Sequence, residues 1–297
     1  MNEEALKKLE RKRKFFRFQF IILPVIFVIG VFLSFGIIQN LNYKGPLNVI
    51  GYFWGVFCII WIIILVYCSG KLVKQLTDKL MHLVLKDEFA TFSYNVNKGV
   101  PEQLFKHSKF IYYYDDYTSS NYISGRVDGG KQFAMSNIAV SVETTDSDGN
   151  TSSHTVFKGI FAVLETGQAN GFELTIAPDV KNKYINQLLN SIKKMGGVKN
   201  IVRLENVEFE RYFEVYSDNQ IEARKIITIE FMEKLMLLRK KLNKPITIIY
   251  KDSKIYLFAA NLIIAPKTKL LFKGLTNEII EETKNTIKDM YDTMKLL

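Results

Sequence analysis

Two long apolar stretches near the N-terminus constrain this 297-residue chain more than any other feature. From Phe18 to Gly70 there is no acidic residue, and Lys44 is the single basic one. Residues 20–38 and 49–68 are apolar runs of 19 and 20 residues. At ~1.5 Å rise per residue, each run as a helix spans about 30 Å, the thickness of the hydrocarbon core of a bilayer. The sequence therefore predicts a hairpin of two transmembrane helices within residues 18–70.

Three alternatives to a transmembrane hairpin fit these runs less well. A cleaved signal peptide has a shorter apolar core, and here a second span follows at once. A lipoprotein signal ending at Cys68 would have the bulky Tyr67 where a small residue belongs. A buried hairpin of a soluble protein would not leave so long a stretch without an acid.

Basic residues beside the spans predict their orientation. Residues 1–17 contain seven bases and three acids, the connection at 39–48 has one base, and three lysines follow at positions 71, 74 and 79. Because cytoplasmic flanks carry an excess of Lys and Arg, we expect a multi-pass protein of the cell (inner) membrane with both termini cytoplasmic. We also expect the basic segment 1–17 to be attracted to anionic lipid of the bilayer.

Small residues recur in the outer half of both predicted spans. Gly30 and Ser34 are four positions apart in the first span, as are Gly51 and Gly55 in the second. Such spacing lets helix backbones approach closely. These residues are expected to pack the two helices of the hairpin together, with packing between protomers as the alternative.

The rest of the chain divides into a juxtamembrane helical segment, residues 71–107, and a cytoplasmic domain, residues 108–297. Leu72, Leu76 and Leu80 recur at helical spacing, which predicts that the second span continues as a helix to about residue 92. Beyond residue 112, alternating apolar residues and polar turns predict strands up to about residue 177. Grouped strands with helices at the margins indicate an α+β fold with a mainly antiparallel sheet.

Further elements are predicted towards the C-terminus. They are a helix over 182–195, a strand over 209–216, a helix opened by a capping box of Ser217 and Gln220, a helix over 230–242, paired strands at 245–250 and 254–260, and a final helix from Asn277.

No sequence motif assigns a chemistry. The three histidines, His82, His107 and His154, share no metal-ligand spacing, and no phosphate loop, Rossmann glycine pattern or zinc-protease helix is present. We therefore expect no cofactor and no metal. The basic run at residues 239–241 ends a predicted helix, where cations complement the helix dipole, so no nucleic-acid partner is expected.

One group of polar residues is the best candidate for a site. These residues are predicted to gather where a strand meets a helix: Asp179, Glu214, Asp218, Glu222 and Arg224. The alternative is that Asp218 and Glu222 simply stabilise the start of that helix.

Three stretches resemble a known family. They are FKGIF at residues 157–161, LTIAPD at 174–179 and, above all, EFERYFEVYSDNQIEAR at 208–224. On these the chain resembles the bacterial membrane-protein family called domain of unknown function 3137, over about residues 75–290. The resemblance implies an uncharacterised protein without established activity or catalytic residues. Some members are thought to accompany LemA-type membrane proteins, which implies such a partner.

Three functions are compatible with these features. The first is a binding or scaffold module held at the membrane. The second is a membrane-anchored enzyme of an unrecognised type. The third is a homo-oligomer that senses or shapes the bilayer through its hairpin.

Overall fold

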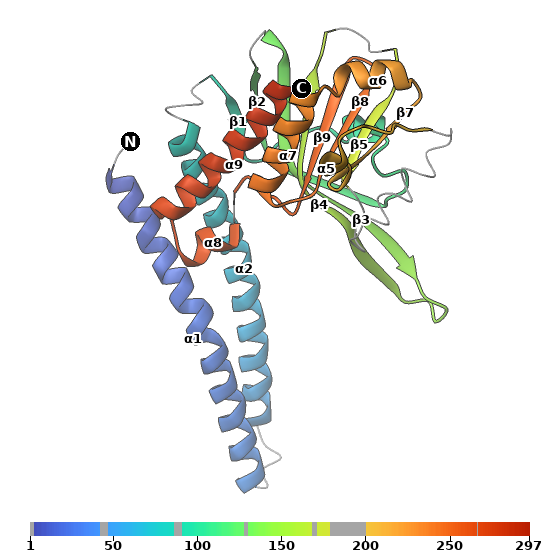
Figure 1. Ribbon diagram of the computed structural model, residues 1–297. Coiled ribbons are helices and arrows are strands. Elements are labelled where there is room, and N and C mark those ends of the chain that lie inside the picture. The colour runs from blue at the N-terminus through green and yellow to red at the C-terminus, as the bar shows by residue number, and fades with distance from the viewer. Residues whose placement is uncertain are drawn as a thin grey trace. The chain divides into compact units, whose positions relative to one another are not determined.

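The computed structural model describes residues 3–41, 47–85, 91–127, 130–167, 171–178, 200–265 and 267–297 (Figure 1). The chain forms two compact units. We call the first the anchor unit, which comprises Met1–His82 and Pro266–Ile280, and the second the sheet unit, which comprises Leu83–Ala265 and Glu281–Leu297.

The anchor unit contains two long helices, α1 (Glu3–Leu41) and α2 (Leu47–Leu85). Among the described residues, one helix is long and apolar enough to cross a membrane, Ile59–Leu85 within α2. That stretch exposes large apolar side chains such as Ile63 and Val66. It overlaps the second predicted span, whereas the first predicted span, residues 20–38, remains a prediction. Of the predicted packing residues, Gly30 lies on α1, and the side chains of Ser34, Gly51 and Gly55 are outside the described residues.

A short helix from the C-terminal part of the chain, α8 (Lys267–Phe272), completes the anchor unit. Leu72 and Leu76 of α2 are buried and pack against Phe16 of α1 and against Leu271 and Leu275. The leucine spacing in α2 therefore marks a buried stripe, as predicted, and α2 is helical through Leu85. Residues 86–90 lie outside the described part.

The sheet unit is built on a nine-stranded antiparallel sheet in its described part. The strands lie in the order β1-β2-β3-β4-β9-β8-β5-β7-β6. Their bounds are β1 Ser93–Asn95, β2 Asp116–Arg126, β3 Gln132–Thr145, β4 Thr151–Glu165, β5 Leu174–Pro178, β6 Asn200–Ile201, β7 Phe213–Ser217, β8 Ile246–Lys251 and β9 Lys254–Ala260. The predicted α+β class with an antiparallel sheet and flanking helices is confirmed.

The helices that accompany the sheet are short except for two. They are α3 Glu102–Ser108, α5 Val207–Glu210, α6 Gln220–Ile226, α7 Ile229–Leu242 and α9 Asn277–Leu296. The first residues of α9 belong to the anchor unit and the rest to the sheet unit. One face of α9 is buried and consists of Ile279, Thr283, Ile287, Met290 and Met294.

Each face of the sheet is covered by different elements. Figure 1 shows α7 lying across the strands of the sheet, and Phe231 and Leu235 are among its buried residues. On the opposite side, α3 supplies Phe105 to a buried cluster with Phe161 of β4 and Phe258 of β9. Side chains alternate between the faces of a strand, so β4 and β9 contribute buried side chains to the packing on both faces of the sheet. Both faces of the central strands are therefore buried.

Two predicted boundaries are wrong, and both errors come from local capping. The predicted strand 209–216 begins instead at Phe213, because Asn206 accepts a hydrogen bond from the Phe209 backbone N–H and opens the helical turn α5. The helix α6 is capped by Asn219 rather than by Ser217. The predicted helix 182–195 lies outside the described residues.

Candidate functional site

The sheet unit has a pocket of about 690 Å³ on the face of the sheet that α3 covers. Strands β1 to β4 form its floor and rim, and α3 and the loop before it form one wall. The lining is divided between apolar and polar residues. It consists of Thr91, Ser93, Pro101, Leu104, Tyr122, Ser124, Gly125, Arg126, Gln132, Phe133, Ala134, Val163 and Glu165.

The hollow exists because small side chains meet across three strands. The strand register places Ser124 of β2 opposite Ala134 of β3, and Ala134 opposite Val163 of β4. Since directly opposed residues point to the same face, these three side chains form a low row. Leu104 of α3 rises beside that row.

An aromatic cluster holds α3 in place over the sheet. The Phe105 ring is fully buried, and its centroid lies 5.8 Å from that of Phe161 and 6.0 Å from that of Phe258. Both pairs are edge-to-face, the geometry that aromatic quadrupoles favour. Phe105 therefore fixes the position of α3 and, with it, of Leu104 in the pocket wall.

The opposite rim of the pocket is polar and charged. Arg126 of β2 lies opposite Gln132 of β3, and the β3–β4 register continues this row to Glu165 of β4. All three side chains are exposed. The pocket thus has an apolar wall at α3 and a rim with one cation, one amide and one anion.

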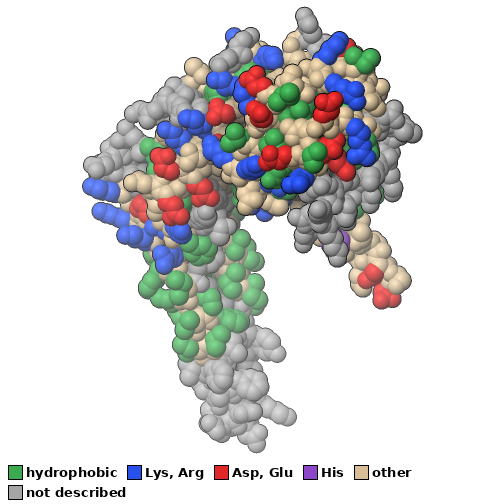
Figure 2. All heavy atoms as spheres, viewed as in Figure 1, with side chains coloured by type: hydrophobic (Ala, Val, Ile, Leu, Met, Phe, Trp, Pro, Cys, Tyr) green, Lys and Arg blue, Asp and Glu red, His purple; other side chains and the backbone are tan. Residues whose placement is uncertain are grey.

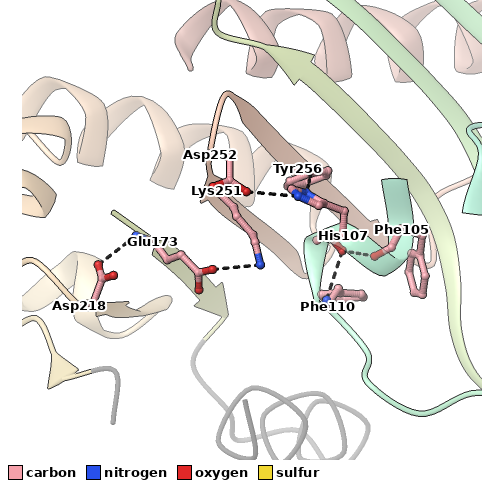
Figure 3. Close-up of polar contacts among 9 residues, drawn as sticks. Phe105, His107, Phe110, Glu173, Asp218, Lys251, Asp252 and Tyr256 are labelled. Carbon is pink, nitrogen blue, oxygen red and sulfur yellow. Dashed lines mark hydrogen bonds and ion pairs between the residues drawn. The ribbon is translucent and has the colours of Figure 1, made fainter. Parts of the chain in front are cut away.

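A second group of polar contacts pins α3 to the turn between β8 and β9 (Figure 3). His107 Nδ1 lies 2.6 Å from the Tyr256 hydroxyl, and His107 Nε2 lies 3.2 Å from an Asp252 carboxylate oxygen. A carboxylate only accepts hydrogen bonds, so the Nε2 atom that faces Asp252 carries a proton. Burial raises the pKa of Tyr256 above its usual range, and the charge of Asp252 adds to the effect. The phenol therefore remains a donor.

An ion pair between a buried lysine and a partly exposed glutamate lies beside these residues in the same view (Figure 3). Lys251 Nζ is 3.0 Å from a Glu173 carboxylate oxygen, and the Lys251 side chain is 9% exposed. Asp218 accepts a hydrogen bond of 3.0 Å from the Glu173 backbone N–H. Because a buried charge is costly without a partner, the pair neutralises Lys251 and joins the ends of β8 and β5.

The predicted polar cluster can be followed residue by residue. Asp179 lies outside the described residues. The Tyr216 hydroxyl donates to Glu214, Glu222 pairs with Lys225, and Arg224 donates to the Arg203 carbonyl oxygen.

Asp218 contacts the backbone of Glu173 and so lies beside the ion pair of Lys251 and Glu173. No hydrogen bond or ion pair joins Glu214, Asp218, Glu222 and Arg224 to one another within the described part of the chain.

The pocket was not predicted from the sequence. Its residues come from four strands and a helix, and none of them forms a motif with a neighbour in sequence. Small residues gave no signal either, because β2 and β3 contain several more besides Ser124 and Ala134, among them Ser119 and Ser136. The contacts of His107, a phenol and a carboxylate, likewise come from residues far away in the chain.

Comparison with known proteins gives a family match but no activity. The sequence model of the family described as "Protein of unknown function (DUF3137)" matches residues 155–297, which confirms the predicted resemblance there. No curated protein matches the chain. Among solved structures, the mycobacterial trehalose monomycolate transport factor A, TtfA, is similar at 12% identity and a TM-score of 0.38, over 74% of this chain and 94% of that chain. A likeness this distant does not define the fold or the function of this chain.

Proposed function

We propose that this chain, whose residues 155–297 match the family described as "Protein of unknown function (DUF3137)", is a membrane-anchored module that binds a small ligand in the pocket beside α3. The pocket is the observation that carries this proposal. Its volume of about 690 Å³ falls within the ~300–1,000 Å³ usual for small-molecule sites. Its mixed lining offers apolar contact on one side and directional polar groups on the other.

The anchor unit supports the membrane part of the proposal. The exposed apolar residues of α1 and α2 include Ile21, Ile29 and Ile63. Figure 2 shows basic side chains gathered on the N-terminal part of α1, next to the apolar surface of the two helices. Lys and Arg at the end of a span are attracted to the anionic cytoplasmic leaflet. We infer a multi-pass protein of the inner membrane with both termini cytoplasmic.

The contacts around His107 favour binding over catalysis by these groups. Both ring nitrogens are engaged, and the Tyr256 side chain that one of them contacts is fully buried. A general base must reach the proton of a substrate, and Tyr256 occupies that nitrogen. His107, Tyr256 and Asp252 therefore serve to hold α3, the wall of the pocket.

Photocrosslinking in native membranes tests the binding function. A photoreactive amino acid at Gln132, on the pocket rim, should give a small-molecule adduct that mass spectrometry detects. The same amino acid at Ser153, exposed on the arm formed by β3 and β4, should give none. The variant Ala134→Trp, which fills the floor, should abolish the adduct at Gln132.

Two results would contradict the proposal. The first is equal labelling from both positions, or an adduct at Gln132 that survives Ala134→Trp. The second is turnover of a metabolite by the purified full-length chain with unchanged rate in Ala134→Trp. A reporter fused after Leu297 tests the membrane topology separately. Its activity should be that of a reporter in the cytoplasm.

A further inference from the structure

The rim of the pocket carries opposite charges on β2 and β4, the two strands on either side of β3. Arg126, Gln132 and Glu165 occupy one row across three neighbouring strands. Adjacent strands are ~4.8 Å apart, so the backbone positions of Arg126 and Glu165 are separated by ~10 Å. The row therefore presents a cation, a neutral amide and an anion in order along one edge of the pocket.

Both charges on this rim are available to a ligand. In the portion of the chain that the structure describes, neither Arg126 nor Glu165 forms an ion pair. Lys254 of β9 lies opposite Glu165 in the register and still makes no ion pair with it. A ligand group with a complementary charge can thus approach each end of the row without displacing a protein partner.

The other side of the pocket suits hydrocarbon. Pro101 and Leu104 stand at the α3 wall, and Ala134 and Val163 lie on the floor. These four residues offer no side-chain hydrogen-bonding group. A ligand that satisfies both sides must combine an apolar part with a head that bears two opposite charges.

We propose that the pocket binds a zwitterionic amphiphile with a single hydrocarbon chain. This proposal rests on the proposed function and names the ligand class of the same pocket. The anionic group of the ligand contacts the Arg126 guanidinium, the cationic group contacts the Glu165 carboxylate, and the chain lies along Leu104 and Val163. A domain tethered to a bilayer meets amphiphiles at a high effective concentration, which favours this class over soluble zwitterions.

Binding of defined lipids to the full chain in a neutral maltoside detergent tests the ligand class. The probe is a lysophosphatidylethanolamine, and the matched lipid is a lysophosphatidylglycerol with the same acyl chain, which lacks the cation. Isothermal titration should show tighter binding of the zwitterion. Arg126→Gln and Glu165→Gln should each weaken it about tenfold, because each removes one charge-assisted contact worth about 1.4 kcal/mol.

A charge swap separates recognition from simple attraction. The double variant Arg126→Glu/Glu165→Arg keeps the net charge and the pocket volume, and it should bind the zwitterion more tightly than either single reversal. Arg211→Gln, an exposed site outside the pocket, should leave the affinity unchanged.

The outcomes distinguish this inference from the function on which it rests. Equal affinity for the two lipids, or no effect of Glu165→Gln, would overturn the zwitterion assignment. Failure of the zwitterion to bind, while the Gln132 adduct still forms and is lost in Ala134→Trp, would also overturn it and leave the binding function intact. Loss of both signals would reject the two proposals together.

Discussion

Truncation of Phe105 is the most direct test of how α3 is held over the sheet. The ring is fully buried, and its centroid lies between 5.2 and 6.3 Å from those of five other aromatic rings. In α3 it is the single buried apolar residue; the other buried position is Ser108. Replacing a buried Phe by Ala costs about 3–5 kcal/mol through lost transfer free energy and the cavity left behind. Phe105→Ala should therefore destabilise the sheet unit by that amount.

The predicted loss can be measured as a change in melting temperature. For a domain of 150–250 residues, 1 kcal/mol shifts Tm by ~2–4 °C, so Phe105→Ala should lower Tm by about 6–20 °C. The measurement is near-ultraviolet circular dichroism of the full chain in detergent, which follows the packed tyrosines. Tyr113→Ala, in the same region and 70% exposed, is the control and should change Tm by less than about 2 °C, as surface substitutions do. Equal shifts in the two variants would refute the assignment of Phe105 as the residue that attaches α3.

Three further predictions concern other parts of the chain. Arg13→Gln should lower the free energy that stabilises the anchor unit by about 1.5–3 kcal/mol, because the nearly buried Arg13 donates to carbonyl oxygens at the end of α8. Limited proteolysis within residues 266–280 should then become faster. Arg11→Gln, at an exposed position, is the control and should leave the proteolysis rate unchanged. Gly159→Ala should cost about 1–3 kcal/mol in urea unfolding, because its Cβ would lie 2.2 Å from a β9 carbonyl oxygen, and Gly70→Ala, with open space around it, should not destabilise. Burial raises the pKa of Tyr250 above its ordinary value of 10.0, so the unfolded chain loses the proton first and stability should fall as pH rises above 10.0; the urea midpoint of Tyr250→Phe should fall less over that range, and equal slopes would contradict this.

The sequence by itself determined those features whose cause is local. Long apolar runs predict spans, and the capping and terminating residues of α7 place its end at Asn243, which adopts the left-handed conformation there. The paired strands on either side of Asp252 and the final helix from Asn277 were likewise predicted. Each depends on residues within one or two turns of a helix or on one tight turn, so the periodicity of side chains is sufficient.

Tertiary structure alone decided which distant residues meet. His107 and Tyr256 are 149 positions apart and hydrogen-bonded, and Arg13, expected among the exposed lipid-facing bases, is buried against a carbonyl oxygen 259 positions away. The pocket rim joins Arg126 to Glu165 through strand register. These contacts follow from strand pairing and from the burial of whole faces of the sheet. The free energy of both depends on the complete arrangement of the chain, so no short segment of sequence encodes these contacts.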